Sequence, residues 1–246
     1  MTLSIDDLTE RDIAKAIDHS LLRPELDDAF VEDGCRLAGA YDVASVCVRP
    51  ADVRRARAIL AGTEVAVGTV IGFPHGNHTT ATKVFEAKQA LADGATELDM
   101  VIQIGALKSG RDAEVLADIA AVVDVAHASG AIVKVIFENA YLTDDEKIRA
   151  CQLSEAAGAD FVKTSTGFAP GGATHDDLRL MRANTSPHIQ VKAAGGVRTL
   201  DALLEVMALG TTRIGATATK TIIDDFRARK AGGDPIRSGA NQEGGY

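Results

Sequence analysis

A short unit recurs along the chain and constrains its fold more than any other feature. In each copy an alanine-rich stretch ends at a glycine, and a short apolar run follows. A more diverged copy lies at Gly39. The unit predicts a helix that ends at a left-handed glycine and then a buried strand. Its repetition indicates βα modules in series, and therefore a parallel sheet. The glycines of the clear copies are Gly94, Gly130, Gly158 and Gly210.

Eight apolar runs in the 246-residue chain are candidate strands, with helical patterns between them. They favour a closed barrel, which typically takes about 250 residues, over an open doubly wound sheet. No G-x-G-x-x-G follows the first run, which weakens a dinucleotide-binding interpretation. We predict a single (β/α)8 TIM barrel over residues 1–229 and a flexible, Gly-rich tail over residues 230–246. The candidate strands are residues 17–22, 43–48, 65–73, 97–104, 132–138, 160–166, 189–194 and 212–217.

Ionisable residues interrupt several of these runs. A parallel barrel strand is buried on both faces, so it should be almost continuously aliphatic. A charge inside such a strand is costly unless it is paired or used. The exceptions therefore mark candidate functional positions. They are Asp18, Asp99, Lys134, Glu138, Lys163 and Lys192.

Lys163 and Lys192 lie late in adjacent runs, where a barrel places its active site. Burial and a cationic neighbour each depress the pKa of a lysine, and a neutral lysine amine condenses with an aldehyde or ketone. Asp99 can shuttle protons and hold the second lysine charged. Two lysines and a carboxylate indicate a Schiff-base carbon–carbon lyase that needs no metal or other cofactor.

The alternative for any one of these lysines is a misplaced strand boundary or a solvent-facing edge residue. Lys134 fits a structural role best, as an ion-pair partner of Asp99. Lys163 and Lys192 are each followed by a small-residue turn that contains glycine. That shared context favours the catalytic interpretation for these two lysines.

Three turns are suited to an anion: T-S-T-G at 164–167, A-G-G-V at 194–197 and G-A-T-A at 215–218. The last precedes a helical stretch, and free N–H groups at a helix N-terminus favour phosphate. Barrels often bind phosphate at the loops after strands seven and eight, although ordinary βα turns also use glycine and threonine. The candidate substrate contacts are Thr166, Gly167, Gly195, Gly196, Gly215 and Thr217.

Composition limits the partners and the location. A formal net charge of -9 argues against nucleic-acid binding, which needs a basic footprint. No apolar run approaches the roughly 20 residues of a membrane span, and residues 1–15 do not resemble a signal peptide. The scattered cysteines, Cys35, Cys47 and Cys151, fit a reducing cytoplasm better than a disulfide framework or a metal site. We therefore expect a cytoplasmic protein.

Several stretches together resemble one family, the deoxyribose-phosphate aldolases, along nearly the whole chain. They are V-I-G-F-P-H-G-N at 70–77, the run at 85–110 that includes E-L-D-M-V-I-Q-I-G-A-L-K-S-G, G-A-D-F-V-K-T-S-T-G-F at 158–168 and V-K-A-A-G-G-V-R-T at 191–199. The resemblance implies a cofactor-free, reversible cleavage of 2-deoxy-D-ribose 5-phosphate to D-glyceraldehyde 3-phosphate and acetaldehyde, in deoxyribose catabolism.

The resemblance also implies roles for individual residues. Lys163 matches the Schiff-base lysine, Lys192 matches a second lysine that assists proton transfer, and Asp99 matches the carboxylate of the proton relay. Asp18 matches a position near the substrate hydroxyls. Backbone contacts to the phosphate match a set of glycines, namely Gly167, Gly195 and Gly196.

The chain departs from the usual pattern of this family in places. Thr217 and Ala218 stand where serine is common, so one phosphate contact is in question. Asn139 and Ala140 follow Glu138, where many members have Thr-Gly. None of these positions is a lysine or the aspartate of the implied mechanism.

Two residues are candidates for accessory roles. Cys47 lies late in the second run, where it would meet reactive aldehydes, and an inert buried cysteine is the alternative. Tyr246 follows two glycines at the end of the sequence, and members of the resembled family often end in tyrosine. Because a phenol can pass a proton to an enamine carbon, we expect Tyr246 to visit the site. The alternative is a disordered end whose last residue is accidental.

Two other classes of function stay open on the sequence. A transaldolase-like or isomerase barrel would reuse the lysine and differ in substrate, because acetaldehyde as the donor is peculiar to the resembled aldolases. A non-catalytic scaffold barrel would have no reason to bury two lysines and a carboxylate. The expected partners are small phosphorylated sugars and aldehydes, with no nucleic acid and no membrane. We also expect a homo-oligomer, either a dimer or a tetramer.

Overall fold

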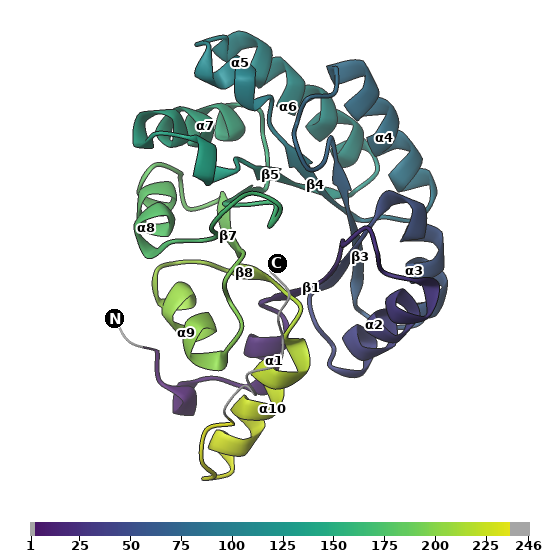
Figure 1. Ribbon diagram of the computed structural model, residues 1–246, viewed down its shortest axis with the longest axis vertical. Coiled ribbons are helices and arrows are strands. Elements are labelled where there is room, and N and C mark those ends of the chain that lie inside the picture. Colours follow the sequence, from purple (N-terminus) through teal and green to yellow (C-terminus); the bar gives the residue numbers. More distant parts are fainter. Residues whose placement is uncertain (1–2, 237–246) are drawn as a thin grey trace.

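Eight strands form one closed parallel barrel in sequence order, because β8 pairs with β1. The computed structural model describes residues 3–236, and Figure 1 shows the ring of helices around the strands. The predicted (β/α)8 barrel is confirmed, and the open doubly wound sheet is wrong. The strands are β1 (Ile17–Leu21), β2 (Ser45–Val48), β3 (Ala66–Ile71), β4 (Glu97–Val101), β5 (Ile132–Ile136), β6 (Phe161–Lys163), β7 (Gln190–Ala194) and β8 (Arg213–Ala216).

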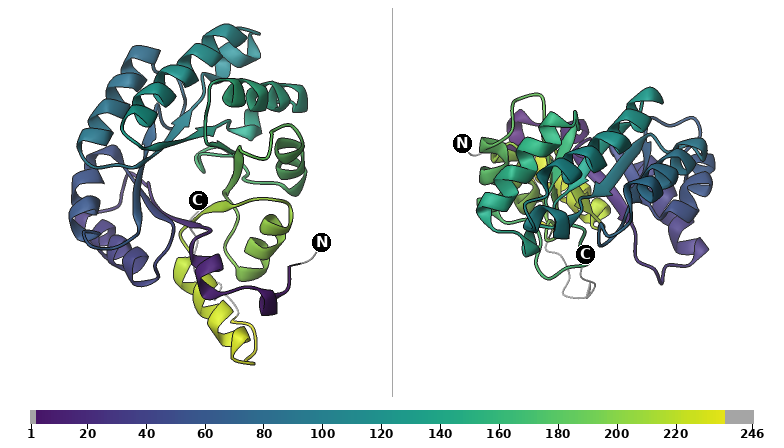
Figure 2. Two further views of the ribbon diagram at one scale, coloured as in Figure 1. Left: turned by 180° about the vertical axis from the view of Figure 1, so that it is seen from behind. Right: turned by 90° about the horizontal axis from the view of Figure 1, so that it is seen from above.

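The helices cover the outside of the barrel, as the two further views show (Figure 2). Threonine side chains cap several of them at the N-terminus, including Thr79, Thr143 and Thr199, where they satisfy a free N–H group. None of the helices within residues 3–236 is long and apolar enough to span a membrane. They are α1 (Glu10–Ala14), α2 (Asp28–Ala40), α3 (Val53–Ile59), α4 (Thr80–Ala92), α5 (Ile104–Lys108), α6 (Asp112–Ala128), α7 (Asp144–Ala156), α8 (His175–Ala183), α9 (Leu200–Ala208) and α10 (Thr219–Lys230), with short 3-10 turns at Ile5–Asp7, Pro50–Asp52 and Asn139–Tyr141.

The recurring helix–glycine–strand unit has the predicted backbone. All the glycines of the clear copies, from Gly94 to Gly210, adopt positive φ angles between 72° and 104°. The diverged copy differs, because Gly39 lies inside α2. There the left-handed residue is Asp42, with φ 47°.

Several observed strands are shorter than the apolar runs that predicted them. The fourth run extends to residue 104, but β4 ends at Val101 and Ile104 already begins α5. The sixth run extends to residue 166, but β6 ends at Lys163. Beyond it the Thr164 hydroxyl donates to the Ala194 carbonyl and accepts from the Ala194 N–H, so a side chain replaces the backbone ladder.

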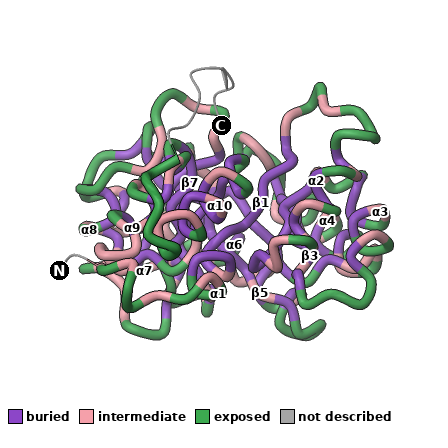
Figure 3. Tube along the Cα trace, turned by 90° about the horizontal axis from the view of Figure 1, so that it is seen from below, coloured by how far each residue is buried: buried purple, intermediate pink, exposed green. Residues whose placement is uncertain are grey.

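The strands are buried along almost their whole length, as the burial colouring shows (Figure 3). The main apolar core lies between the outer face of the barrel and the helices. The inner face of the barrel carries charged side chains instead. Among them, Asp18, Asp99 and Lys192 are each no more than 1% exposed.

The expected tail begins within a helix, because α10 continues to Lys230. The Lys230 ammonium group donates to the carbonyls of Ile5, Asp6 and Leu8 at 2.9–3.0 Å. The backbone N–H of Ile236 donates to an Asp225 carboxylate oxygen at 2.7 Å. Residues 230–236 therefore lie against the barrel domain. Residues 237–246, with Tyr246, lie outside the described residues, so the flexible tail stays a prediction.

A buried ion pair joins α4 to α6 outside the barrel. Lys83 and Asp118 are both fully buried, with 2.5 Å between Nζ and Oδ2. The Lys83 ammonium also donates to the Val101 carbonyl at the end of β4, and the Thr80 hydroxyl donates to the other Asp118 oxygen. Burial lowers the pKa of Lys83, and Asp118 opposes that effect. The pair therefore holds the end of β4 against two helices.

Lys83→Met should lower the free energy of unfolding by about 3–5 kcal/mol, because it leaves the Asp118 carboxylate buried without a cation. The matched control is Arg54→Met, since Arg54 pairs with Asp93 and its side chain is 78% exposed. That exposed pair should contribute no more than about 1 kcal/mol. Urea unfolding of both variants makes the comparison, and equal losses would contradict the importance of the buried pair.

Candidate active site

Six charged side chains inside the barrel form a closed ring in which positive and negative groups alternate. They come from five strands: two carboxylates from β4 and one side chain each from β1, β5, β7 and β8. We call this set the charge ring. In order around the ring, its members are Lys134, Glu97, Arg213, Asp18, Lys192 and Asp99, which returns to Lys134.

Every link of the charge ring is short. Lys134 Nζ lies 3.0 Å from Asp99 Oδ1 and 2.5 Å from Glu97 Oε2. The guanidinium of Arg213 bridges Glu97 and Asp18 at 2.6 and 2.7 Å. Lys192 Nζ closes the ring, 2.5 Å from Asp18 Oδ2 and 2.8 Å from Asp99 Oδ2. Such contacts offset the large desolvation cost of buried ions.

The ring holds its members in their charged forms. Burial alone would raise the pKa of Asp18, but Lys134, Lys192 and Arg213 bring it below its usual range. Burial would likewise raise the pKa of Asp99, and its three lysine neighbours lower it. Burial would lower the pKa of Lys134, but the carboxylates around it raise the value. In each case the paired charges outweigh desolvation.

Lys163 is a seventh charged group, attached to the ring at one point. It is the last residue of β6 and is 1% exposed, and its Nζ lies 2.8 Å from Asp99 Oδ2. The ring alone has three cations and three carboxylates. With a protonated Lys163, the site therefore has one more positive charge than negative charges. Loss of one lysine proton therefore balances the buried site. A neutral amine next to a carboxylate can attack a carbonyl carbon.

Strand register explains why these groups meet. Residues two apart on a strand face the same side, which places Glu97 and Asp99 together on β4. Parallel pairing aligns Asp99 with Lys134, and Lys163 with Lys192. Gly215 is paired with Asp18 and faces the barrel interior beside Lys192. A Cβ at this position would lie 3.8 Å from Lys192 Cε.

Sequence reasoning predicted Asp99, Lys163 and Lys192 as neighbours, and the structure brings these three together. It marked Asp18 as a charge in a strand, and the structure places Asp18 beside Lys192. It also identified Lys134 as an ion-pair partner of Asp99. It missed Glu97 and Arg213. The spacing of two between Glu97 and Asp99 was a usable signal for Glu97. Arg213 lies inside the predicted run 212–217, so its charge in a buried strand was a usable signal for it.

The turn after Lys163 is fixed by a residue with an unusual backbone. Glu138, which follows β5, has a left-handed conformation with φ 56°. Its carboxylate accepts hydrogen bonds from the backbone N–H and the hydroxyl of Thr166. The sequence marked Glu138 as a charge in a strand but gave it no role. Its contact with Thr166 places the 164–167 turn over the barrel mouth.

The glycine turns expected to hold an anion lie close together. Gly167, Gly195 and Gly196 have φ angles of 85°, 83° and 93°. The loop after β6 packs on the turn after β7, since a Cβ on Gly195 would lie 2.9 Å from Gly172 Cα. Nothing lies within 4 Å of the position that a Cβ on Gly196 would take. These turns leave an open, backbone-lined space at the carboxyl ends of β6 and β7.

The N-terminus of α10 adjoins the same end of the barrel. Thr217 and Ala218 precede the helix, and no side chain caps it. The hydroxyl of Thr219 is instead paired with Nδ1 of His19, 2.9 Å away. Burial lowers the pKa of His19 to about 4, so this imidazole is neutral at pH 7. The sequence did not single out His19.

Cys47 lies in a small apolar cluster with Leu22, Val70 and Phe73, separate from the main core. It is 2% exposed, and burial raises the pKa of its thiol to about 11. Because the thiolate is the reactive form, this position favours the inert alternative over the aldehyde-reactive one.

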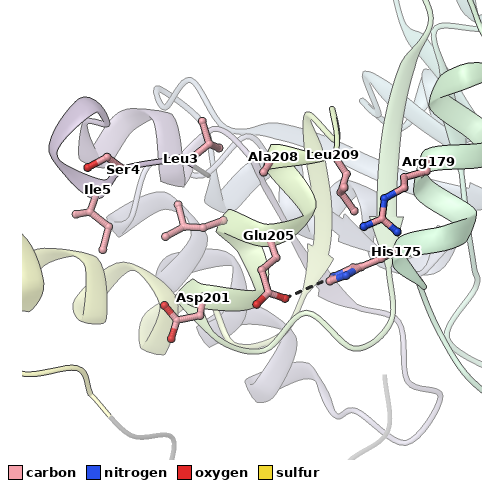
Figure 4. Close-up of a pocket in the computed structure, with 10 residues that line it drawn as sticks. Leu3, Ser4, Ile5, His175, Arg179, Asp201, Glu205, Ala208 and Leu209 are labelled. Carbon is pink, nitrogen blue, oxygen red and sulfur yellow. Dashed lines mark ion pairs between the residues drawn. The ribbon is translucent and has the colours of Figure 1, made fainter. Parts of the chain in front are cut away.

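A groove of about 660 Å3 on the outside of the barrel lacks comparable chemistry (Figure 4). It lies between the N-terminal segment and helices α8 and α9, and His175 faces Glu205 across 3.5 Å. Both side chains are largely exposed to solvent. Within residues 3–236, no group of three or more His, Cys, Asp or Glu side chains is arranged to hold a metal ion. The charge ring with Lys163 is therefore the candidate active site.

Comparison with known proteins identifies the family of this chain. The model of the DeoC/LacD family aldolases matches residues 13–222. A deoxyribose-phosphate aldolase of Rhodopirellula baltica is 51% identical over 240 residues, which covers 98% of this chain and 99% of the relative. A solved structure of a putative deoxyribose-phosphate aldolase from Coccidioides immitis has a TM-score of 0.86 at 42% identity and covers 89% of this chain and 87% of that one.

A second solved structure, the tetrameric deoxyribose phosphate aldolase from Aeropyrum pernix, has a TM-score of 0.84 at 30% identity. It covers 92% of this chain, and this chain covers 95% of it. The matched residues, 13–222, include all eight strands and every position of the charge ring. The chain belongs to the DeoC/LacD family of aldolases.

Proposed function

We propose that this protein is a deoxyribose-phosphate aldolase, a lyase that reversibly cleaves 2-deoxy-D-ribose 5-phosphate to D-glyceraldehyde 3-phosphate and acetaldehyde. The observation that carries the proposal is the position of Lys163. This buried lysine lies at the mouth of the barrel and gives the site one positive charge more than the closed charge ring balances. The relatives from Rhodopirellula baltica and Coccidioides immitis bear the name of this activity.

The chemistry follows from the Lys163 amine. The neutral amine adds to C1 of the open-chain aldehyde, and loss of water gives a protonated Schiff base. The electron pair of the C2–C3 bond then moves into this cation, while the C3 hydroxyl gives up its proton and glyceraldehyde 3-phosphate leaves. The remaining enamine takes a proton at C2, and water releases acetaldehyde from the lysine.

Asp99 and Lys192 are suited to the proton transfers. One carboxylate oxygen of Asp99 lies 2.8 Å from both Lys163 Nζ and Lys192 Nζ, so it links the two amines directly. A positioned acid or base is typically worth about 10²–10⁴-fold in rate. In this role Lys192 lies between Asp18 and Asp99, and Asp99 exchanges protons with the reacting lysine. Lys134 has a structural part, because it is held by three carboxylates.

The phosphate group fits the backbone turns around the site mouth. Free N–H groups at glycine turns and at a helix N-terminus bind anions without basic side chains. Gly167, Gly195 and Gly196 supply such turns, and Thr217 offers a hydroxyl before α10. An acidic chain can bind a phosphosugar in this way, since the protein's net charge does not report on local N–H groups.

The other functional classes fit less well. A scaffold gains nothing from burying seven charges in its barrel. A transaldolase-like or isomerase activity would use the same lysine, and donor specificity separates it from the proposed reaction. A cytoplasmic location and a homo-oligomeric state stay predictions, with the tetrameric Aeropyrum pernix relative as a precedent for the latter.

Reduction with borohydride in the presence of acetaldehyde should fix one ethyl group on Lys163, because the Schiff base is the species that borohydride reduces. Peptide mass mapping locates the label. Lys163→Met should remove both the label and nearly all cleavage activity, whereas Lys108→Met, at a lysine whose side chain is 44% exposed, should change neither. A label on Lys192 or Lys134 in the unaltered protein would show that the assignment is wrong.

Gly196→Ile should lower kcat/KM for deoxyribose 5-phosphate roughly 10- to 100-fold, because loss of one charge-assisted hydrogen bond costs about 1.5–3 kcal/mol. It should affect unphosphorylated deoxyribose far less. Gly110→Ile is the matched control, since Gly110 also has positive φ and open space but lies between α5 and α6. Equal losses for both substrates in the Gly196 variant would place the phosphate elsewhere.

A further inference from the structure

Two members of the charge ring, Glu97 and Arg213, lie away from the reacting lysine, and within residues 3–236 neither has an ion pair or hydrogen bond with it or with Asp99. Glu97 and Arg213 are the first residues of β4 and β8, whereas Lys163 is the last residue of β6. Glu97 contacts Lys134 and Arg213, and Arg213 contacts Glu97 and Asp18. These two residues lie on the floor of the site, behind the groups that the proposed mechanism uses.

The cations of the site are not held equally. Lys134 contacts the carboxylates of Glu97, Asp99 and Asp18, and Arg213 bridges Asp18 and Glu97. Lys192 contacts both Asp18 and Asp99. Within residues 3–236, the ion pair of Lys163 is with Asp99 alone, through an oxygen that also contacts Lys192. Among the charged groups of the site, Lys163 is therefore the cation with the least electrostatic support.

A guanidinium differs from an ammonium at this position. Arginine stays protonated throughout the pH range in which proteins are folded, so Arg213 is a fixed positive charge. With Arg213 fixed, three carboxylates face four cations, and only a lysine can release the surplus proton. A buried excess charge is costly, so the site favours this release.

We propose that Glu97 and Arg213 are positioning residues that set the proton count of the site, so that the neutral amine falls on Lys163 and not on Lys192. This inference rests on the proposed role of Lys163 as the Schiff-base lysine. Glu97 and Arg213 touch no substrate in this account. They act through the charge balance of the ring, which fixes how many protons the three lysines share.

Other ionisable groups near Lys163 do not alter this balance. Cys47, on β2, is neutral at pH 7 because burial raises the pKa of its thiol to about 11. Glu138, at the end of β5, directs its carboxylate to Thr166. Within residues 3–236, the charged groups linked to Lys163 through Asp99 are the members of the charge ring, on β1, β4, β5, β7 and β8.

Single charge substitutions should move the pH dependence of Lys163 in opposite directions. Arg213→Gln removes the fixed cation, so three lysines face three carboxylates with no surplus proton. Formation of the neutral amine then requires a higher pH, by about one unit or more, and labelling at pH 7 falls about tenfold or more. Glu97→Gln leaves four cations and two carboxylates, so the profile moves to lower pH by a similar amount.

The double variant Glu97→Gln/Arg213→Gln provides the decisive comparison. It retains three lysines and two carboxylates, so the surplus of one charge returns and the profile should return to that of the unaltered protein. The measured quantity is the pH dependence of borohydride trapping of acetaldehyde on Lys163, located by peptide mapping. Glu97→Asp keeps the charge of the ring and serves as the control for altered packing, with circular dichroism to verify the fold.

The inference would be overturned by pH profiles that are unshifted in both single variants. It would also be overturned if the loss of labelling in the double variant equalled the sum of the losses in the single variants. The ring would then have a structural role only. If Arg213→Gln does not fold, Glu97→Gln decides by itself, because a downward shift supports the inference and an unchanged or upward profile rejects it. If the unaltered protein carries the label on a lysine other than Lys163, the proposed catalytic assignment fails, and this failure is distinct from an unshifted profile on a correctly labelled Lys163.

Discussion

The alternating charge ring inside the barrel is the constraint on which the rest of the site depends. Each buried ion carries a desolvation penalty of several kcal/mol, and the ring offsets it by giving every member at least two partners of opposite sign. Its links connect β1, β4, β5, β7 and β8, and Lys163 attaches β6. A barrel that opened between β8 and β1 would break the contact of Arg213 with Asp18, so closure of the sheet and assembly of the site are one event.

The same ring gives the site its chemical character. Because the six members balance one another, the surplus positive charge of the site comes from Lys163. The proposed binding of the phosphosugar needs no basic surface, because it relies on backbone N–H groups at the positive-φ turns of Gly167, Gly195 and Gly196. Activation of the amine comes from the barrel interior, and substrate orientation comes from the loops. This division matches the usual separation of scaffold and loops in barrel enzymes.

The sequence predicted what depends on local pattern. Helix–glycine–strand units indicated the barrel, and charges in aliphatic runs indicated Lys163, Lys192 and Asp99. Arg213 also stands in a predicted strand, but its partner could not be predicted, because Asp18 lies 195 residues away and only closure of the barrel brings the two together. The ends of the strands could not be predicted from local pattern either. β6 ends where the Thr164 hydroxyl replaces a hydrogen bond between the backbones of neighbouring strands.

The central claim is that the neutral amine of the resting site belongs to Lys163. Nuclear magnetic resonance of protein with nitrogen-15 at the lysine Nζ positions tests it without substrate. Signals can be assigned by single lysine-to-methionine substitutions and followed from pH 5 to pH 10. The account predicts that the Lys163 amine loses its proton first, while Lys134 and Lys192 remain charged. Deprotonation of Lys192 before Lys163, or retention of all three protons across that range, would contradict it.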